Sequence, residues 1–232
     1  MVRIDIANNN LLFLFEINGT PIYLTETIRN TWVIMAIMII IAVIVKTKLR
    51  HFKEKPEGFQ NVVEIAVDFI ANFTRNTLGE KLAFLDSWFF TVFFFILFSN
   101  LSGLVAGTRP PTGDIATTVP LALTTFIIIH AVGIKFQKGE YFKAYLKPFF
   151  LFLPMNLIGE ISKPLSLSFR LFGNVLGGII VMQVMYSMLP FVLRFIIPGV
   201  GHIYFDLFSG AIQTYVFTIL SLTFIQLNSV TD

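Results

Sequence analysis

Long apolar stretches separated by short polar segments dominate the chain. A hydrophobic stretch of about 20 residues is long enough to cross a bilayer as a helix, and backbone polar groups in lipid must be satisfied within the segment. We therefore predict an all-α polytopic membrane protein with five membrane-inserted helices, at about 29–46, 84–106, 115–135, 149–189 and 191–228.

The segment 56–79 follows a different pattern. Its apolar residues recur at helical spacing, and charged or amide residues lie between them. This pattern predicts an amphipathic helix that is too polar to span, placed along the cytoplasmic surface or packed on other helices there. Residues 29–232 are interpreted as one membrane domain, preceded by an external N-terminal segment, 1–28.

The last two apolar segments are too long to cross a membrane upright. A helix of about forty residues would measure about 60 Å, whereas the hydrocarbon core is about 30 Å thick. Pro154 and Pro164 offer bending points in the first of these segments, and Pro198–Gly201 offers a break in the second. We predict two long, strongly tilted helices that pack together.

The charges between the apolar segments predict the orientation. Five Lys or Arg residues lie within 46–55, and four lysines lie within 135–147. Because basic loops stay in the cytoplasm, the N-terminus is expected outside and the C-terminus inside. Residues 1–28 show no Arg-rich, acid-poor leader, so we expect a bacterial plasma membrane.

The composition supports the same class. Charged residues make up 13% of the chain, about half the share of soluble domains, and the mean hydropathy is +0.77. The chain has no cysteine, which excludes disulfides and thiolate metal sites. Its net charge of +3 is spread over the ends of apolar runs, which argues against a nucleic-acid partner.

Arg170 is the most informative single residue, because it lies inside an apolar segment. A guanidinium stays charged in proteins, and holding it at mid-membrane costs roughly 3 to more than 10 kcal/mol. Such a residue normally faces a water-filled cavity or a counter-charge. The nearest acid on its helical stripe, Glu160, lies ten residues away, or about 15 Å along the axis.

Two stripes of polar or small residues run along the last two segments. The first comprises Asn156, Glu160, Lys163, Arg170, Asn174 and Gly177, and the second His202, Asp206, Ser209, Gly210 and Gln213. Structural alternatives remain open: Glu160 and Lys163 could form an internal pair, and Gln213 could form a hydrogen bond between helices that only stabilises their packing. Asp206 could neutralise Arg170.

The motifs resemble those of subunit a of the F-type ATP synthase. The resemblance rests on SKPLSLSFRLFGN at 162–174 and GAIQTYVFTIL at 210–220, and extends to NLSG at 100–103 and PTGD at 111–114. It covers the chain from about residue 56 to the end.

This resemblance implies a non-catalytic, ion-translocating stator that forms two aqueous half-channels against a ring of c subunits. Further implied partners are the subunit b stalk and the other ATP synthase subunits. No cofactor or metal is implied. The implied ion-translocation residues are Arg170, Gln213 and Asn174. The implied half-channel lining is Glu160, Lys163, Asp206, Asp114, His202 and Asn156.

Two positions bear on the ion. Proton-type members of the family often carry an acid nine residues after the arginine, where this chain has Ile179, and a His or acid seven before the glutamine, where it has Asp206. The transported ion is therefore H⁺ or Na⁺.

Two other classes of protein are less compatible with the sequence. A stand-alone secondary ion transporter should show two related halves, and no such repeat is visible. An intramembrane enzyme should show a nucleophile with its base, a metal-ligand cluster or a phosphate-binding loop, and no such motif is found.

Overall fold

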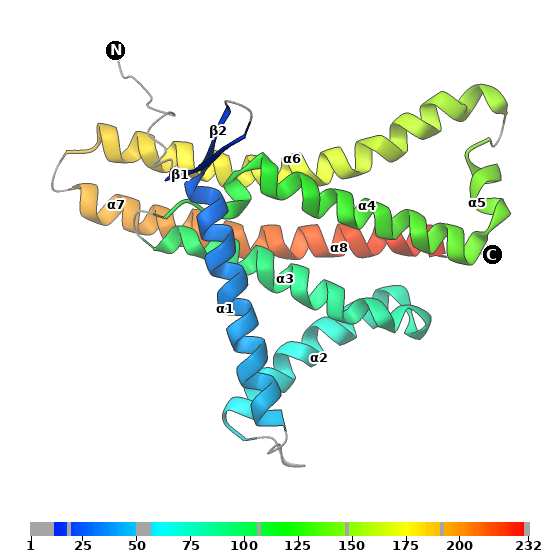
Figure 1. Cartoon of the computed structure of the whole chain (residues 1–232), viewed down its shortest axis with the longest axis horizontal. Coiled ribbons are helices and arrows are strands. Elements are labelled where there is room, and N and C mark those ends of the chain that lie inside the picture. Colours follow the sequence, from blue (N-terminus) through cyan, green and yellow to red (C-terminus); the bar gives the residue numbers. More distant parts are fainter. Residues whose placement is uncertain are drawn as a thin grey trace.

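The computed structural model describes residues 12–17, 20–49, 57–105, 108–146, 149–190 and 193–229. A small antiparallel hairpin comes first, followed by helices (Figure 1). The elements are β1 (Leu12–Ile17), β2 (Thr20–Leu24), α1 (Glu26–Lys48), α2 (Phe59–Leu78), α3 (Asp86–Leu101), α4 (Ile115–Gln137), α5 (Gly139–Ala144), α6 (Leu153–Met188), α7 (Leu193–His202) and α8 (Gly210–Ser229). Short 3-10 turns occupy Glu80–Leu85, Ser102–Leu104, Pro111–Gly113 and Phe150–Phe152, and a π-helix occupies Ile203–Ser209.

Five of the described helical segments are long and apolar enough to cross a membrane: Glu26–Lys48, Glu80–Leu104, Ile115–Gln137, Phe150–Met188 and Ile197–Ser229. This confirms the predicted all-α polytopic class with five membrane-inserted helices. The hairpin β1–β2 was not predicted, because the sequence indicated no helix or strand within 1–28.

The two long helical courses lie side by side. α6 has 36 residues and is therefore about 54 Å long. α7, the π-helix and α8 form a second continuous course that packs against it, and α1 is steeply inclined to the direction of both courses (Figure 1). If α1 follows the membrane normal, the two long courses are strongly tilted, and this tilt lets such lengths fit a core of about 30 Å. α6 bends along its course and carries Pro164 in its interior (Figure 1).

The predicted break at Pro198–Gly201 is wrong. Pro198 lies inside α7, which continues to His202, and the departure from α-helical geometry comes in the π-helix that follows. Gly201 serves close packing instead, since a Cβ added to it would lie 2.7 Å from the Sδ of Met182 on α6.

The hydrophobic core lies where α3, α4 and α8 meet. One buried cluster joins these helices to α2, and a second joins them to α6 through Leu167 and Leu171. α2 is a helix of mixed character, as predicted. Its Ile70 is fully buried in the first cluster, whereas Val62 and Phe69 are exposed. Only part of its apolar surface therefore packs on the other helices.

Candidate functional site

Arg170 lies near the middle of α6, on an exposed face. Its Nη2 atom is 3.5 Å from the Oγ of Ser166, one turn earlier. A Cβ added to Gly173 or Gly177, which follow on the same helix, would meet no atom within 4 Å. Arg170 is therefore exposed, and the helix beyond it is open at both glycines.

The two acids that could neutralise Arg170 are engaged elsewhere. The Oε1 of Glu160 lies 2.5 Å from the Nζ of Lys163, and the Oδ2 of Asp206 lies 2.5 Å from the Nδ1 of His202. Within the described part of the chain no ion pair reaches Arg170. The arrangement in which Asp206 neutralises Arg170 is therefore not the one in this structure.

Asn174 and Gln213 connect α6 to α8. The Nδ2 of Asn174 donates to the Oε1 of Gln213 at 2.5 Å, and Gln213 is only 3% exposed. Asn174 lies one turn after Arg170, so this bond holds the second long helix beside the arginine. In the described chain the side chain of Gln213 bonds Asn174 and not Arg170.

A small pocket borders this bond. Its polar lining consists of Asn100, Asn174, Asp206, Ser209 and Gln213. Three of these residues were predicted from the sequence. Asn100 appeared there only within a motif, and Ser209 only within a stripe. His202 joins the group through its bond to Asp206.

The histidine has a further partner on α6. The hydroxyl of Tyr186 lies 3.1 Å from the Nε2 of His202, so a tyrosine, a histidine and Asp206 form one row of polar contacts. Sequence reasoning missed Tyr186, because only the antiparallel packing of α6 on α7 brings it near. The carboxylate of Asp206 also closely approaches the 3-10 turn that follows α3: it would lie 3.0 Å from a Cβ added to Gly103.

Ile179 stands where proton-type members of the resembled family often carry an acid. Its Cδ1 would lie 3.0 Å from a Cβ added to Gly113, in the turn before α4. This position is therefore an apolar contact between α6 and that turn.

Glu160 and Lys163 lie in a second polar region, apart from the pocket. They pair along α6, and the other oxygen of Glu160, Oε2, is buried with no hydrogen-bond partner among the residues that the structure describes. Asn156, one turn before Glu160, donates to the backbone oxygen of Tyr145 at 2.8 Å. Asn156 thus ties α6 to the segment around α5.

Two tyrosines of this segment lie near Glu160. The hydroxyl of Tyr145 donates to that of Tyr141 at 2.7 Å. Burial, and to a lesser degree the charge of Glu160, raises the pKa of Tyr141 above the ordinary tyrosine value. Burial also raises the pKa of Tyr145, with further contributions from the bond to Tyr141 and from Glu160. Both phenols therefore stay protonated at neutral pH.

Asp114 lies outside the pocket lining and has two bonds of its own. Its Oδ1 accepts from the backbone N–H of Ala116 and so caps α4, and its Oδ2 accepts from the hydroxyl of Thr27 on α1 at 2.7 Å. This predicted half-channel residue thus fastens the start of α4 to α1.

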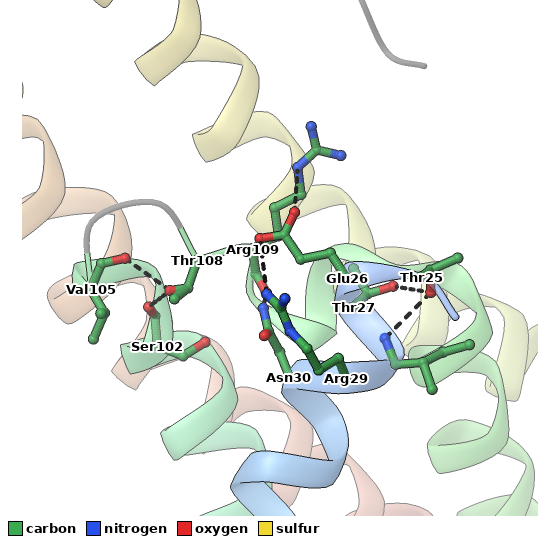
Figure 2. Close-up of polar contacts among 10 residues, drawn as sticks. Thr25, Glu26, Thr27, Arg29, Asn30, Ser102, Val105, Thr108 and Arg109 are labelled. Atoms are coloured by element: carbon green, nitrogen blue, oxygen red, sulfur yellow. Dashed lines mark hydrogen bonds and ion pairs between the residues drawn. The ribbon is translucent and has the colours of Figure 1, made fainter. Parts of the chain in front are cut away.

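Further polar contacts fasten α1 to the same loop. Figure 2 shows the carboxylate of Glu26 between the guanidinium groups of Arg29 and Arg109, at 3.8 and 3.9 Å. Asn30 donates to the backbone oxygen of Arg109 at 2.9 Å. α1 is otherwise peripheral, so these contacts hold its N-terminal end against the loop between α3 and α4.

The fold and the site together define a class. This is a polytopic α-helical membrane protein whose central charge faces outward and not into its own bundle. The described residues contain no group of three or more His, Asp or Glu side chains that could hold a metal ion.

Comparison with known proteins gives the family. The model of the family described as ATP synthase A chain matches residues 28–226. ATP synthase subunit a of Moorella thermoacetica is 35% identical over 213 residues, covering 91% of this chain and 93% of the relative. ATP synthase subunit a of Geobacter sulfurreducens is 33% identical over 226 residues, covering 93% and 95%. This chain belongs to the ATP synthase subunit a family, and it is a membrane subunit of that complex.

Proposed function

We propose that this chain is the ion-translocating stator of a rotary F-type ATP synthase, with Arg170 as its essential fixed charge. The observation that carries the proposal is the open position of Arg170, which has no ion pair in the described chain. Leaving a guanidinium unpaired in the membrane is costly. A mid-membrane carboxylate on each subunit of a c-ring supplies the missing counter-charge.

In this proposal, ions reach and leave the ring through two offset aqueous half-channels. One path passes the pocket and is bordered by Asn174, Gln213, Asp206 and His202, with Asp114 nearby. The other passes Glu160, Lys163 and Asn156. The charge of Arg170 separates the two paths, because it repels a cation that moves straight across and favours an ionised ring carboxylate in front of it.

The proposed setting is a bacterial plasma membrane, with the N-terminus outside and the C-terminus in the cytoplasm. The lysines and arginines of 46–55 and 135–147 support this orientation. The partners are the c-ring, the subunit b stalk and the remaining subunits. Nucleotide chemistry belongs to those other chains, and this chain carries H⁺ or Na⁺.

The test is Arg170→Ala in the assembled complex. Ion-driven ATP synthesis should be abolished while the complex still assembles. Ser166→Ala, which removes the nearest polar contact of the guanidinium, serves as the matched control and should retain most of the activity. Normal coupled synthesis by Arg170→Ala would overturn the proposal.

The contact with the ring has its own test. The chain lacks cysteine, so a single Cys placed at 170 or 174 is unique in it. It should crosslink to a Cys placed beside the ring carboxylate. A second assay identifies the ion: ATP hydrolysis that requires Na⁺ and survives a protonophore indicates Na⁺, and indifference to Na⁺ across pH indicates H⁺.

A further inference from the structure

The start of α8 is held by a buried amide of α3. The Nδ2 of Asn100 donates to the backbone oxygen of Gly210 at 2.9 Å and lies 3.4 Å from the Oγ1 of Thr214. The Oδ1 of Asn100 accepts from the hydroxyl of Thr112 at 2.6 Å. All three polar side chains are at most 3% exposed. Because buried hydrogen bonds are costly to break, this contact fixes α8 against α3 firmly.

The contact is also tight in the steric sense. A Cβ added to Gly210 would lie 2.9 Å from the Cβ of Asn100. Only a glycine lets the backbone of α8 come this close to the amide. Gly210 is the first residue of α8, immediately after the π-helix Ile203–Ser209.

The contact between Asn100 and Gly210 matters because it lies at the junction between the π-helix and α8, where the helix rotation changes. Asp206 and Gln213 are seven residues apart, a spacing that returns to the same face of an α-helix. A π-helix has i→i+5 bonds and more residues per turn. A seven-residue spacing that crosses a π-helix therefore does not return to the same face. Asp206 approaches Gly103, in the 3-10 turn after α3, whereas Gln213 bonds Asn174 on α6, and both residues border the pocket. The rotation of α8 relative to the π-helix decides where Gln213 points.

We propose that Asn100 is a positioning residue for the ion path, acting through Gln213. By holding the Gly210 carbonyl at the junction, it fixes the rotation at which Gln213 meets Asn174 and Asp206 borders the pocket. Thr112 supports Asn100 by occupying its acceptor atom. This inference rests on the proposed function, and it adds a residue of α3 to a site that otherwise lies on α6 and on the helical course of α7 and α8.

The test uses the assembled complex and three variants. Asn100→Leu keeps the branched shape of the side chain and removes its three hydrogen bonds, and Thr112→Val removes only the supporting hydroxyl. Thr125→Val is the control, because Thr125 is fully buried but its hydroxyl bonds Leu121 within its own helix, α4. Retained ATP hydrolysis and normal subunit composition show that each variant has assembled.

Two readouts are needed. The first is ATP-driven ion uptake per ATP hydrolysed. The second is the reaction rate of a Ser209→Cys reporter in the pocket with a small thiol reagent, which does not depend on coupling. Loss of a buried hydrogen bond predicts that Asn100→Leu changes both readouts by about fivefold or more. Thr112→Val should change both less, and Thr125→Val should change neither.

The proposal is overturned if Asn100→Leu leaves either readout within about twofold of the parent. An unchanged thiol rate would mean that Asn100 does not shape the pocket, and unchanged coupling would mean that the shape does not matter to the ion path. Failure of the proposed function is distinguishable, because it would appear as normal synthesis by Arg170→Ala whatever the thiol rates.

Discussion

The polar groups on the two sides of Arg170 are built differently. On the Gln213 side, comprising Asn100, Asn174, Asp206 and Gln213, bonds between amides, hydroxyls and backbone oxygens join α3, α6 and α8. The Glu160 side comprises Glu160, Lys163, Tyr141 and Tyr145. Its ion pair lies within one helix, and one oxygen of Glu160 has no hydrogen-bond partner in the described part of the chain.

This difference teaches what each side can do. Bonds between helices fix geometry, so the Gln213 side sets how the long helices face each other. An i,i+3 pair within α6 sets no such geometry. A buried oxygen without a partner is unfavourable unless water or an ion reaches it. Within the proposed function, the Glu160 side would exchange ions with water, and the Gln213 side would align the helices.

Among changes that separate the two sides, the largest effect is expected from Gln213→Leu. It removes the link between α6 and α8 and leaves the amide of Asn174 without its acceptor, so we expect ion uptake coupled to ATP hydrolysis to fall about tenfold or more. Gln226→Leu makes the same change at an exposed position of α8 and should have little effect. Equal losses in the two variants would contradict an aligning role for Gln213.

Glu160→Gln should have the next largest effect. It keeps the shape but removes the charge and its pairing with Lys163, and we expect ion uptake to fall severalfold. Glu140→Gln is the control, because Glu140 forms an i,i+3 pair with Lys143 on the exposed surface of α5. Exposed pairs contribute little. If both variants pump ions at the parent rate, the Glu160 side is only structural.

Gly133→Ala should disturb Tyr141, which belongs to the Glu160 side. An added Cβ would overlap the ring of Tyr141, so the tyrosine side chain must shift. Overpacking of this kind costs about 1–3 kcal/mol. We expect a lower thermal midpoint of the purified complex and a change in ion uptake of about twofold. Gly139→Ala, which meets nothing within 4 Å, should leave both quantities unchanged.

The smallest effect concerns pH. The pKa values of Tyr141 and Tyr145 are raised in the folded chain, mainly by burial. Folding therefore favours the protonated phenols: the stability that they contribute is full below the unfolded value of about 10 and is lost as pH rises above it. Tyr145→Phe should show a shallower fall of the thermal midpoint above pH 10. If Tyr145→Phe and the parent show the same pH profile of the thermal midpoint, the pKa of Tyr145 is not raised by burial.

The sequence identified much of this protein correctly. Hydrophobic length predicted five membrane-inserted helices, because backbone groups in lipid leave few alternatives. The lack of an acidic partner for Arg170 on its own stripe was also predictable, since the nearest acid on that helix face lies ten residues away. These inferences depend only on local periodicity and on the cost of charge in lipid.

Tertiary structure alone decided which residues meet. The bond between Asn174 and Gln213 and the clamp of Asn100 on Gly210 join positions 39 and 110 apart in the chain. The π-helix carries Asp206, which approaches Gly103 in the turn after α3, and the fold gathers Asp206, Ser209 and Gln213 around one pocket with Asn100 of α3. The physical reason is that helix contacts depend on rotation and on close approach at glycines, and a periodic pattern in one segment contains neither.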